Sequence, residues 1–209
     1  MSWMATERYS VRQAPGSFAL VQDLVNTKEI RPYAPDLLAT AESASAWLAG
    51  AVRAWAETSA TAVPDGADLL TEREVPRLRA LRKTVGALLP AGTGPRPPAP
   101  GIPTTSVRLA PAPDGGVAVV PVGSGAAWAE SAVWAEVMRA QFEGVWPRLK
   151  LCRNEVCGSA FYDASRNNSG VWHSVRTCGN AANLRASRAR RRGQHPEGDA
   201  GPAPEPQGE

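Results

Sequence analysis

The sequence predicts a mainly α-helical (α+β) protein, in which a helical N-terminal domain with one β-hairpin precedes a small cysteine-containing module that ends in a basic helix. Three observations predict this class. Apolar residues recur at spacings of three and four along four segments, as in amphipathic helices. Two short apolar runs flank an Asp-Gly turn. All three cysteines gather near the C-terminus, just before a run of arginines.

The helical domain is predicted to contain four helices, each with apolar residues on one face. They span about residues 18–27, 43–58, 72–89 and 126–142. Prolines such as Pro32 end the first of them, because proline cannot continue a helix. Tryptophans at helical spacing, such as Trp47 and Trp55, are interpreted as core residues. The N-terminal residues 1–17 are expected to be loose.

A β-hairpin is predicted between the third and fourth helices. Its strands, Val107–Leu109 and Val117–Val122, flank Asp114–Gly115, a dipeptide typical of tight hairpin turns. The preceding segment Pro90–Pro103 is too rich in proline and glycine to be helical. We therefore divide the chain into a loose N-terminus, a helical domain, a cysteine-containing module and a disordered acidic tail. These parts span residues 1–17, 18–147, 148–192 and 193–209.

The net charge of +3 hides a strong asymmetry along the chain. Residues 148–192 carry ten arginines and lysines against two acidic residues, a net charge of +8, whereas the tail from Gly193 carries −4. A concentrated basic segment indicates a polyanionic partner. The alternative interpretation is a solvated face that keeps the chain soluble.

Neither membrane insertion nor secretion is expected. No apolar run approaches the ~18 residues of a membrane span, and the first residues lack the apolar region of a signal peptide. Three cysteines cannot all pair within one chain. We therefore expect a reducing cytoplasmic location, where clustered cysteines usually indicate metal binding or catalysis.

The cysteines and one histidine form two short-spaced pairs. Four residues separate Cys152 from Cys157 and His173 from Cys178, and 15 residues lie between the pairs. This spacing is typical of structural Zn²⁺ sites, which take four nitrogen or sulfur ligands in a tetrahedron. Soft thiolates disfavour magnesium and calcium. The sequence therefore predicts a closed structural zinc site. The alternatives are buried cysteines without metal and a catalytic cysteine activated by His173.

A basic helix is predicted directly after the last ligand. Asn180 is a suitable N-cap, and no helix-breaking residue follows until Gly193. Ala181 and Leu184 are expected to dock this helix on the zinc core. Several arginines share one side of the helix or lie just before it, where their guanidinium groups match phosphate spacing. These candidate nucleic-acid-binding residues are Arg176, Arg185, Arg188, Arg191 and Arg192.

The segment from residue 151 to 192 resembles the CGNR zinc finger found at the C-terminus of bacterial transcription regulators. The residues that carry the resemblance are Cys152, Cys157, Phe161, Asp163, Ser165, Asn167, Trp172, Ser174, Cys178, Gly179 and Asn180. Two features depart from the family pattern. His173 stands where a cysteine is usual, and zinc accepts this exchange. Ala181 and Asn183 replace the usual basic residues at the head of the helix.

The N-terminal domain resembles the helical stress-induced regulatory module that usually precedes this finger. The motifs that carry the resemblance are Asp23–Thr27, Asp36–Thr40, Trp47–Leu48 and Arg79–Leu89, in this order. The two resemblances together imply a DNA-binding regulator with structural zinc and with an N-terminal domain that senses a signal or oligomerises. They do not identify the inducer, the operator or the direction of regulation.

We therefore predict a zinc-containing DNA-binding transcription regulator of the bacterial cytoplasm, associated with the nucleoid and expected to act as a homodimer. The alternative is a zinc-stabilised RNA-binding or protein–protein adaptor. An enzyme is not expected, because the chain lacks a phosphate-binding glycine loop and any histidine before His173. If the N-terminal domain binds a small molecule, the candidate residues are Asp23, Asn26, Arg79 and Arg82, with helix capping and surface salt bridges as the alternative roles.

Overall fold

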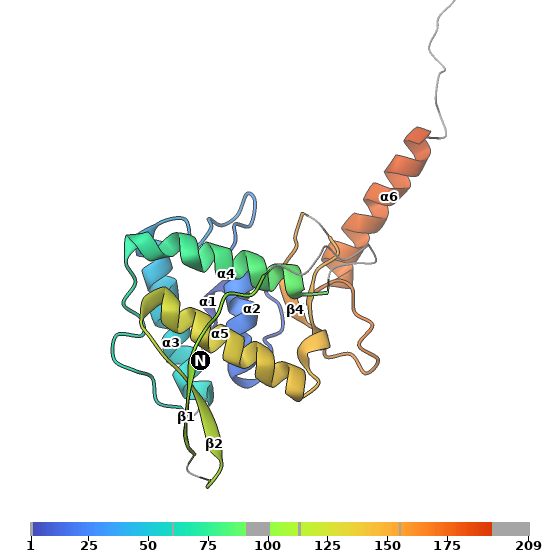
Figure 1. Cartoon of the computed structure of the whole chain (residues 1–209). Coiled ribbons are helices and arrows are strands. Elements are labelled where there is room, and N and C mark those ends of the chain that lie inside the picture. The colour runs from blue at the N-terminus through green and yellow to red at the C-terminus, as the bar shows by residue number, and fades with distance from the viewer. Residues whose placement is uncertain (1, 60, 91–100, 113, 155, 194–209) are drawn as a thin grey trace, which may run out of the picture.

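The computed structural model describes residues 2–59, 61–90, 101–112, 114–154 and 156–193, with side chains up to residue 191. Six α-helices and two two-stranded antiparallel sheets occur within these ranges (Figure 1). The α-helices are α1 (Met4–Glu7), α2 (Ala19–Val25), α3 (Ala41–Ser59), α4 (Val75–Leu88), α5 (Gly125–Phe142) and α6 (Asn180–Gly193). The strands are β1 (Val107–Pro111), β2 (Val117–Pro121), β3 (Leu149–Leu151) and β4 (Ala160–Tyr162). In the described ranges, no helix combines the length and the apolar character that a membrane span requires.

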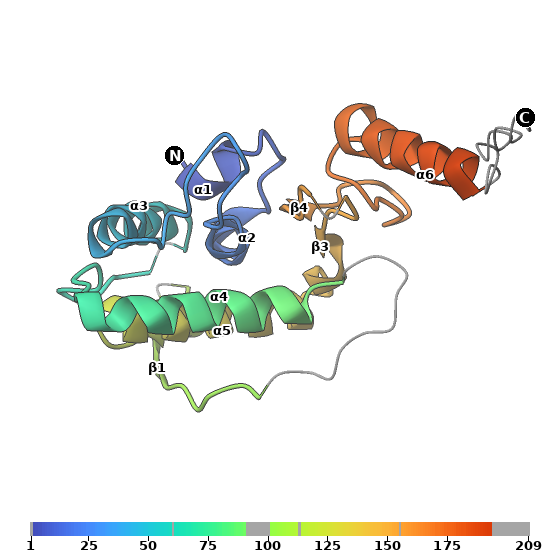
Figure 2. The same ribbon diagram turned by 90° about the horizontal axis from the view of Figure 1, so that it is seen from above.

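The hydrophobic core lies around α2. All seven residues of α2 are buried, because α1, α3, α4, α5 and β4 contact it from different sides. α4 and α5 run side by side along one side of the molecule (Figures 1 and 2). The fully buried side chains include Trp47, Trp55 and Trp128, and the rings of Trp55 and Trp128 meet edge to face at 5.6 Å. The interpretation of the tryptophans at helical spacing as core residues is therefore confirmed.

The predicted helices and the predicted hairpin are confirmed, with ends that shift by a few residues. Leu109 pairs with Val119 in the antiparallel register of β1 and β2. Gly115, at the tip of this hairpin, has a φ of +84°, which glycine adopts without steric cost. Most of the proline-rich segment and all but the first residue of the predicted acidic tail lie outside the described residues.

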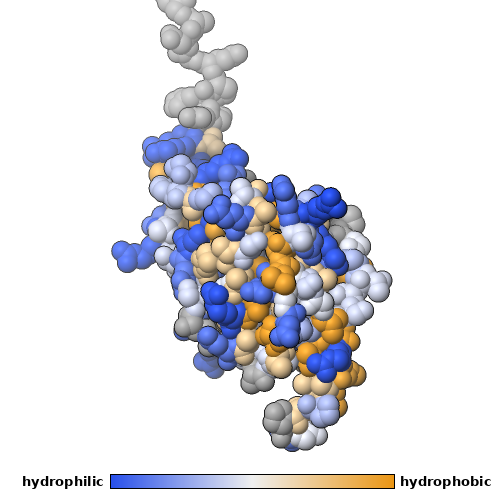
Figure 3. Space-filling view, turned by 90° about the vertical axis from the view of Figure 1, so that its left-hand side faces the viewer, coloured by the Kyte–Doolittle hydropathy of each residue, from blue (hydrophilic) through white to orange (hydrophobic). Residues whose placement is uncertain are grey.

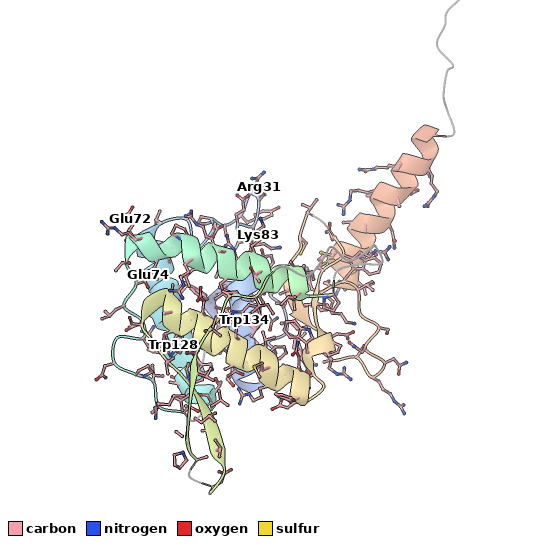
Figure 4. All side chains as sticks on the ribbon, viewed as in Figure 1. Arg31, Glu72, Glu74, Lys83, Trp128 and Trp134 are labelled. Carbon is pink, nitrogen blue, oxygen red and sulfur yellow. The ribbon has the colours of Figure 1, made fainter. Side chains whose placement is uncertain are left out.

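One carboxylate fixes the beginnings of two helices. Glu74 accepts hydrogen bonds from the backbone N (2.9 Å) and Oγ1 (2.7 Å) of Thr71, and from the backbone N of Ala126 (3.2 Å). Figure 4 shows Glu74 between the starts of α4 and α5. Gly125 passes so close that a Cβ there would lie 2.5 Å from the carbonyl oxygen of Leu69, at a φ of +53°. This contact requires glycine and places the start of α5 against the segment before α4.

The expectation that the first 17 residues are loose is wrong. α1 packs against α2 and α3, and both Trp3 and Thr6 are buried. Asp23 accepts hydrogen bonds from the backbone N of Thr6 at 2.7 Å and from Nε1 of Trp47 at 2.8 Å. One buried carboxylate thereby joins three helices. With four residues, α1 is too short to show helical periodicity in the sequence, and it owes its order to these tertiary contacts.

Candidate metal centre

The first two ligands come from a tight knuckle between β3 and β4. The backbone N of Cys152 donates to the carbonyl oxygen of Ser159 at 2.8 Å and closes the loop. The backbone N atoms of Cys157 and Gly158 both donate to the carbonyl oxygen of Asn154 at 2.8 Å. Gly158 adopts a φ of +51° that suits glycine, and it reverses the chain so that the two thiols approach each other.

The other two ligands lie at a single wide helical turn, Val175–Gly179, that leads into α6: His173 lies two residues before the turn and Cys178 lies within it. Ser174 caps this turn, because its side chain accepts from the backbone N of Thr177 and its carbonyl oxygen accepts from that of Cys178 at 3.0 Å. The predicted N-cap at Asn180 is therefore wrong, since Asn180 already has helical φ and ψ of −63° and −42°. The wide turn places the true cap several residues earlier than the α-helical pattern indicates.

The four candidate ligands converge on one point. Their ligand atoms all lie within 4.8 Å of one another. Nδ1 of His173 lies 3.4 Å from Sγ of Cys157 and 3.6 Å from Sγ of Cys178. A zinc tetrahedron with bonds of about 2.3 Å to sulfur and about 2.0–2.1 Å to nitrogen has N···S edges of about 3.5 Å. The residues therefore fit Zn²⁺. With four protein ligands the site is closed, as structural zinc sites are.

The two thiols of the first pair differ in acidity. Cys152 donates a hydrogen bond to the sulfur of Cys157, which lowers the pKa of Cys157 to about 3 and raises the pKa of Cys152. Ser159 and His173 add to the stabilisation of the Cys157 thiolate, with Oγ of Ser159 3.3 Å from the sulfur. Zn²⁺ must displace the protons that remain, so its affinity decreases as the solution becomes more acidic.

An ion pair orders the loop between the two ligand pairs. Nζ of Lys150 lies 2.8 Å from Oδ2 of Asp163 and also donates to the carbonyl oxygens of Asn168 and Gly170. Asp163 accepts from the backbone N atoms of Ser165 (2.9 Å) and Gly170 (2.6 Å). Burial alone would raise the pKa of Asp163, but these contacts outweigh it and hold that pKa well below its usual range. The loop is thus built around one ionised carboxylate.

The helical body, formed by α1 to α5, holds the knuckle between β3 and β4 through residues in and just after α2. The amide of Asn26 pairs with the backbone of Ala160, donating to its O at 2.9 Å and accepting from its N at 2.8 Å. Gln22 also donates to the oxygen of Ala160 at 3.2 Å, and Nζ of Lys28 donates to the carbonyl oxygen of Gly158. Burial lowers the pKa of Lys28. Sequence reasoning missed these anchors, although the motif that runs from Asp23 to Thr27 and the adjacent lysine contain two of them.

Apolar contacts join the same two parts of the chain. Phe161 and Trp172 pack with the buried cysteines, and Val11 from the N-terminal segment packs against this cluster. Leu149 and Ala160, from β3 and β4, belong to the main core. The zinc centre therefore rests directly on the helical body.

The four residues proposed from the sequence for small-molecule binding all make hydrogen bonds within the protein. They are Asp23, Asn26, Arg79 and Arg82. Arg82 forms a two-pronged ion pair with Asp36 at 2.7 and 2.8 Å. Arg79 donates to the carbonyl oxygens of Leu38 and Ala39, both at 2.7 Å. These contacts favour structural roles, in which the four side chains hold α1, α2, α4 and the segment before α3 together.

The basic helix α6 begins at the zinc centre and points away from the helical body (Figures 1 and 2). Leu184 is 52% exposed, so the expectation that it docks on the zinc core is wrong. Beyond its first turn, α6 points away from the helical body, so within the described part of the chain Leu184 has no neighbouring surface on which to pack. Ala181, in that first turn, is half-buried.

The predicted nucleic-acid-binding arginines divide into two groups. Nη2 of Arg185 donates to Oδ1 of Asn154 at 2.5 Å, which ties α6 to the knuckle of the first ligand pair. Arg176, Arg188 and Arg191 are exposed. The side chain of Arg192 lies outside the described part of the structure. All four described arginines are thus exposed, and Arg185 differs in its hydrogen bond to Asn154, which fits a positioning role.

Two family models match the chain. Residues 148–191 match the CGNR zinc finger, and residues 19–143 match ABATE, described as "Putative stress-induced transcription regulator". The comparison with curated proteins finds no match. The two matches confirm both resemblances seen in the sequence, and the Cys₃His cluster confirms zinc as the expected metal. Because the larger match covers more than half of the chain, this protein belongs to the ABATE family and carries a CGNR zinc finger after its ABATE domain.

Proposed function

We propose that this protein is a DNA-binding transcription regulator in which zinc positions α6 and the exposed arginines of α6 contact DNA. The observation that carries the proposal is the placement of these arginines on a helix whose start is fixed by a metal ligand. Cys178 lies two residues before α6, so a metal tetrahedron that includes this cysteine sets the direction of the helix. The link from Arg185 to Asn154 supports the same direction.

The dimensions and charge of α6 suit a DNA groove. Its 14 residues span about 21 Å at 1.5 Å per residue, and the major groove, about 12 Å wide, accepts an α-helix. Arg188 and Arg191 lie about 60° apart around the helix, on one side of it. Among the described residues no carboxylate forms an ion pair with either side chain. Their guanidinium groups are therefore free to bind phosphates, and Arg176, in the turn before α6, is also exposed.

The remaining parts of the proposal follow from this role. A regulator that acts on bacterial DNA works in the cytoplasm, at the nucleoid, and requires no catalytic group. Specific affinity from one short helix usually requires two half-sites, so we propose a homodimer. The helical domain supplies the site for a signal or for the second copy.

The test is a duplex-binding titration with the zinc-loaded full chain, followed by fluorescence anisotropy over a range of salt concentrations. We expect duplex binding that weakens steeply with salt. The double variant Arg188→Ala plus Arg191→Ala should reduce the slope of log K against log salt by about 1.8, at about 0.9 per phosphate contact. The charge-matched control, Arg53→Ala plus Arg73→Ala, removes two exposed arginines from the helical body and should leave the slope unchanged.

Three outcomes would contradict the proposal. The first is no duplex binding at low salt, and the second is equal slopes for the two double variants. The third is a single-stranded RNA that competes more strongly than duplex DNA, which would favour the zinc-stabilised RNA-binding adaptor. Removal of zinc with a chelator should abolish binding, because the direction of α6 then loses its metal support.

A further inference from the structure

One surface of the helical body exposes an unusual number of large apolar side chains. The side chains come from both strands of the β1–β2 hairpin and from the second half of α5. They are Val107, Leu109, Val117, Val119, Met138 and Phe142, which we call the hairpin surface. Leu109 is 66% exposed, Val117 72% and Phe142 85%. Figure 3 shows apolar side chains gathered on the hairpin, above its grey tip at the lower right.

The hairpin surface surrounds a groove. The groove encloses about 570 Å³ between the hairpin and α5, and Trp55 of α3 also lines it. Glu136 lies in its wall, almost fully buried, where it accepts from Nε1 of Trp55 at 2.8 Å and pairs with Arg139. These polar groups of the wall thus have partners within the protein, so the surface offers a partner mainly apolar contact.

The hairpin carries little of the charge that usually keeps a free sheet edge from pairing. It has two strands, and Arg108 is the single charge in the ten residues of β1 and β2. Natural edge strands usually carry several charges or are covered, since unpaired edges attract other strands. A two-stranded hairpin is at best marginally stable when it is not covered. These features indicate that the hairpin surface is covered in the working form of the protein.

We propose that a second copy of this chain covers the hairpin surface, so that the protein is a dimer related by a two-fold axis. Each of these large apolar side chains exposes on the order of 100 Å² of surface. The six residues together therefore expose on the order of 600 Å², close to the ~800 Å² that each partner buries in a standard interface. A two-fold interface places the same surface on both partners, so charges of both signs at its rim can pair across it. Arg139 and Glu143, which line the groove, supply one charge of each sign.

A small molecule explains the surface less well. A ligand that filled the groove would leave most of Phe142 and Leu109 in water, because both are exposed well beyond the depth of the groove. A protein partner of similar shape buries them. Contiguous exposed apolar surface of this extent is typical of protein–protein interfaces.

The position of the hairpin surface agrees with the proposed function without depending on it. The hairpin and α6 lie at opposite ends of the molecule (Figures 1 and 2). A dimer through the hairpin surface therefore leaves both α6 helices free. If the helices bind DNA as proposed, the two half-sites lie well apart.

The test is sedimentation velocity of the zinc-loaded full chain across micromolar concentrations, without DNA. We expect a reversible dimer for the wild type. The double variant Leu109→Glu plus Phe142→Glu should raise the dimer Kd at least about 100-fold, because it places four carboxylates in one apolar interface. The matched control is Leu69→Glu plus Tyr33→Glu, at side chains 70% and 86% exposed elsewhere, and it should dimerise like the wild type.

Circular dichroism and zinc content verify that the variants are folded, and the milder pair Leu109→Ala plus Phe142→Ala replaces the charged pair if it misfolds. A wild type that stays monomeric, or a hairpin-surface variant that dimerises like the control, overturns the proposal. The proposal is also overturned, in favour of a small-molecule site, if the protein is a monomer that binds an apolar fluorescent dye at one site and the hairpin-surface variant loses this binding. The DNA titration above is independent. A monomer that binds duplex disproves the dimer, including the homodimer of the proposed function, but leaves DNA binding intact. A dimer that does not bind duplex disproves DNA binding and leaves the hairpin-surface interface intact.

Discussion

The substitution Asn26→Ala tests whether the helical body and the zinc finger form one folding unit. The amide of Asn26 is fully buried and pairs with both backbone groups of Ala160, 134 residues away. Without it, the backbone N–H of Ala160 loses its acceptor, at a cost of about 1–3 kcal/mol for an unsatisfied buried group. Gln22 still donates to the oxygen of Ala160, so the loss on that side is about 1 kcal/mol. We therefore expect a destabilisation of about 3 kcal/mol.

The assay is urea unfolding followed by tryptophan fluorescence, with zinc in excess. Four of the tryptophans, Trp3, Trp47, Trp55 and Trp128, are fully buried in the helical body, so their emission reports its unfolding. For a chain of this length, 3 kcal/mol corresponds to a decrease of about 6–12 °C in Tm. The zinc affinity should decrease as well, because Asn26 helps to order the chain next to the knuckle.

Asn183→Ala is the control, since Asn183 is exposed on α6 and its replacement should change the free energy of unfolding by less than about 0.5 kcal/mol. If Asn26→Ala behaved like this control, the reasoning would be refuted. A loss of zinc affinity with no change in the unfolding of the helical body would also refute it, because the two parts would then fold independently.

Three further predictions follow from the structure. Chelation of zinc should lower the thermal midpoint of the helical body in a single transition, because Leu149 and Ala160 belong to its core; two separate calorimetric transitions would contradict this. Gly125→Ala should destabilise the protein by about 3 kcal/mol in urea unfolding, since its Cβ would clash with the carbonyl oxygen of Leu69 at a positive φ, and an unchanged midpoint would count against that contact. Asp163 has a lowered pKa, so its contribution to the stability of the folded protein is complete above its unfolded pKa of about 3.9 and is lost as the pH falls toward the lower folded value. If the free energies of unfolding of wild type and Asp163→Asn stay parallel in acid, this role is excluded.

The features that the sequence predicted well are local. Apolar periodicity located α3 and α5 because each is long enough to repeat its buried positions over several turns. Ligand spacing located the zinc site because a knuckle and a turn are both determined by residues close in the chain. The first helix is too short to show a period, and the wide turn before α6 does not follow the α-helical pattern on which the choice of Asn180 as N-cap rested.

What the sequence could not show are contacts between distant parts of the chain. Nothing local to Asn26 indicates that its partner is Ala160, and nothing local to Lys28 indicates the carbonyl oxygen of Gly158. Arg185 illustrates the same limit, because helical geometry placed it on the predicted DNA-binding face, while its actual partner, Asn154, belongs to the knuckle. Helical geometry predicts the direction in which a side chain points, but not the contact that the side chain makes once the chain has folded.

These contacts also decide where the cations of α6 lie, since Ala181 and Asn183 stand where basic residues are usual at its head. Ala181 is half-buried beside the zinc centre and Asn183 carries no charge, so the first turn of α6 offers no cation. Arg185, one turn later, is held by Asn154. The first cation of the helix beyond this link to Asn154 is Arg188, ten residues after Cys178, or about 15 Å along the axis. The basic surface thus lies on the outer half of α6. If α6 binds DNA as proposed, its cations therefore meet the DNA from the free outer half of the helix and not from the end beside the zinc centre (Figure 1).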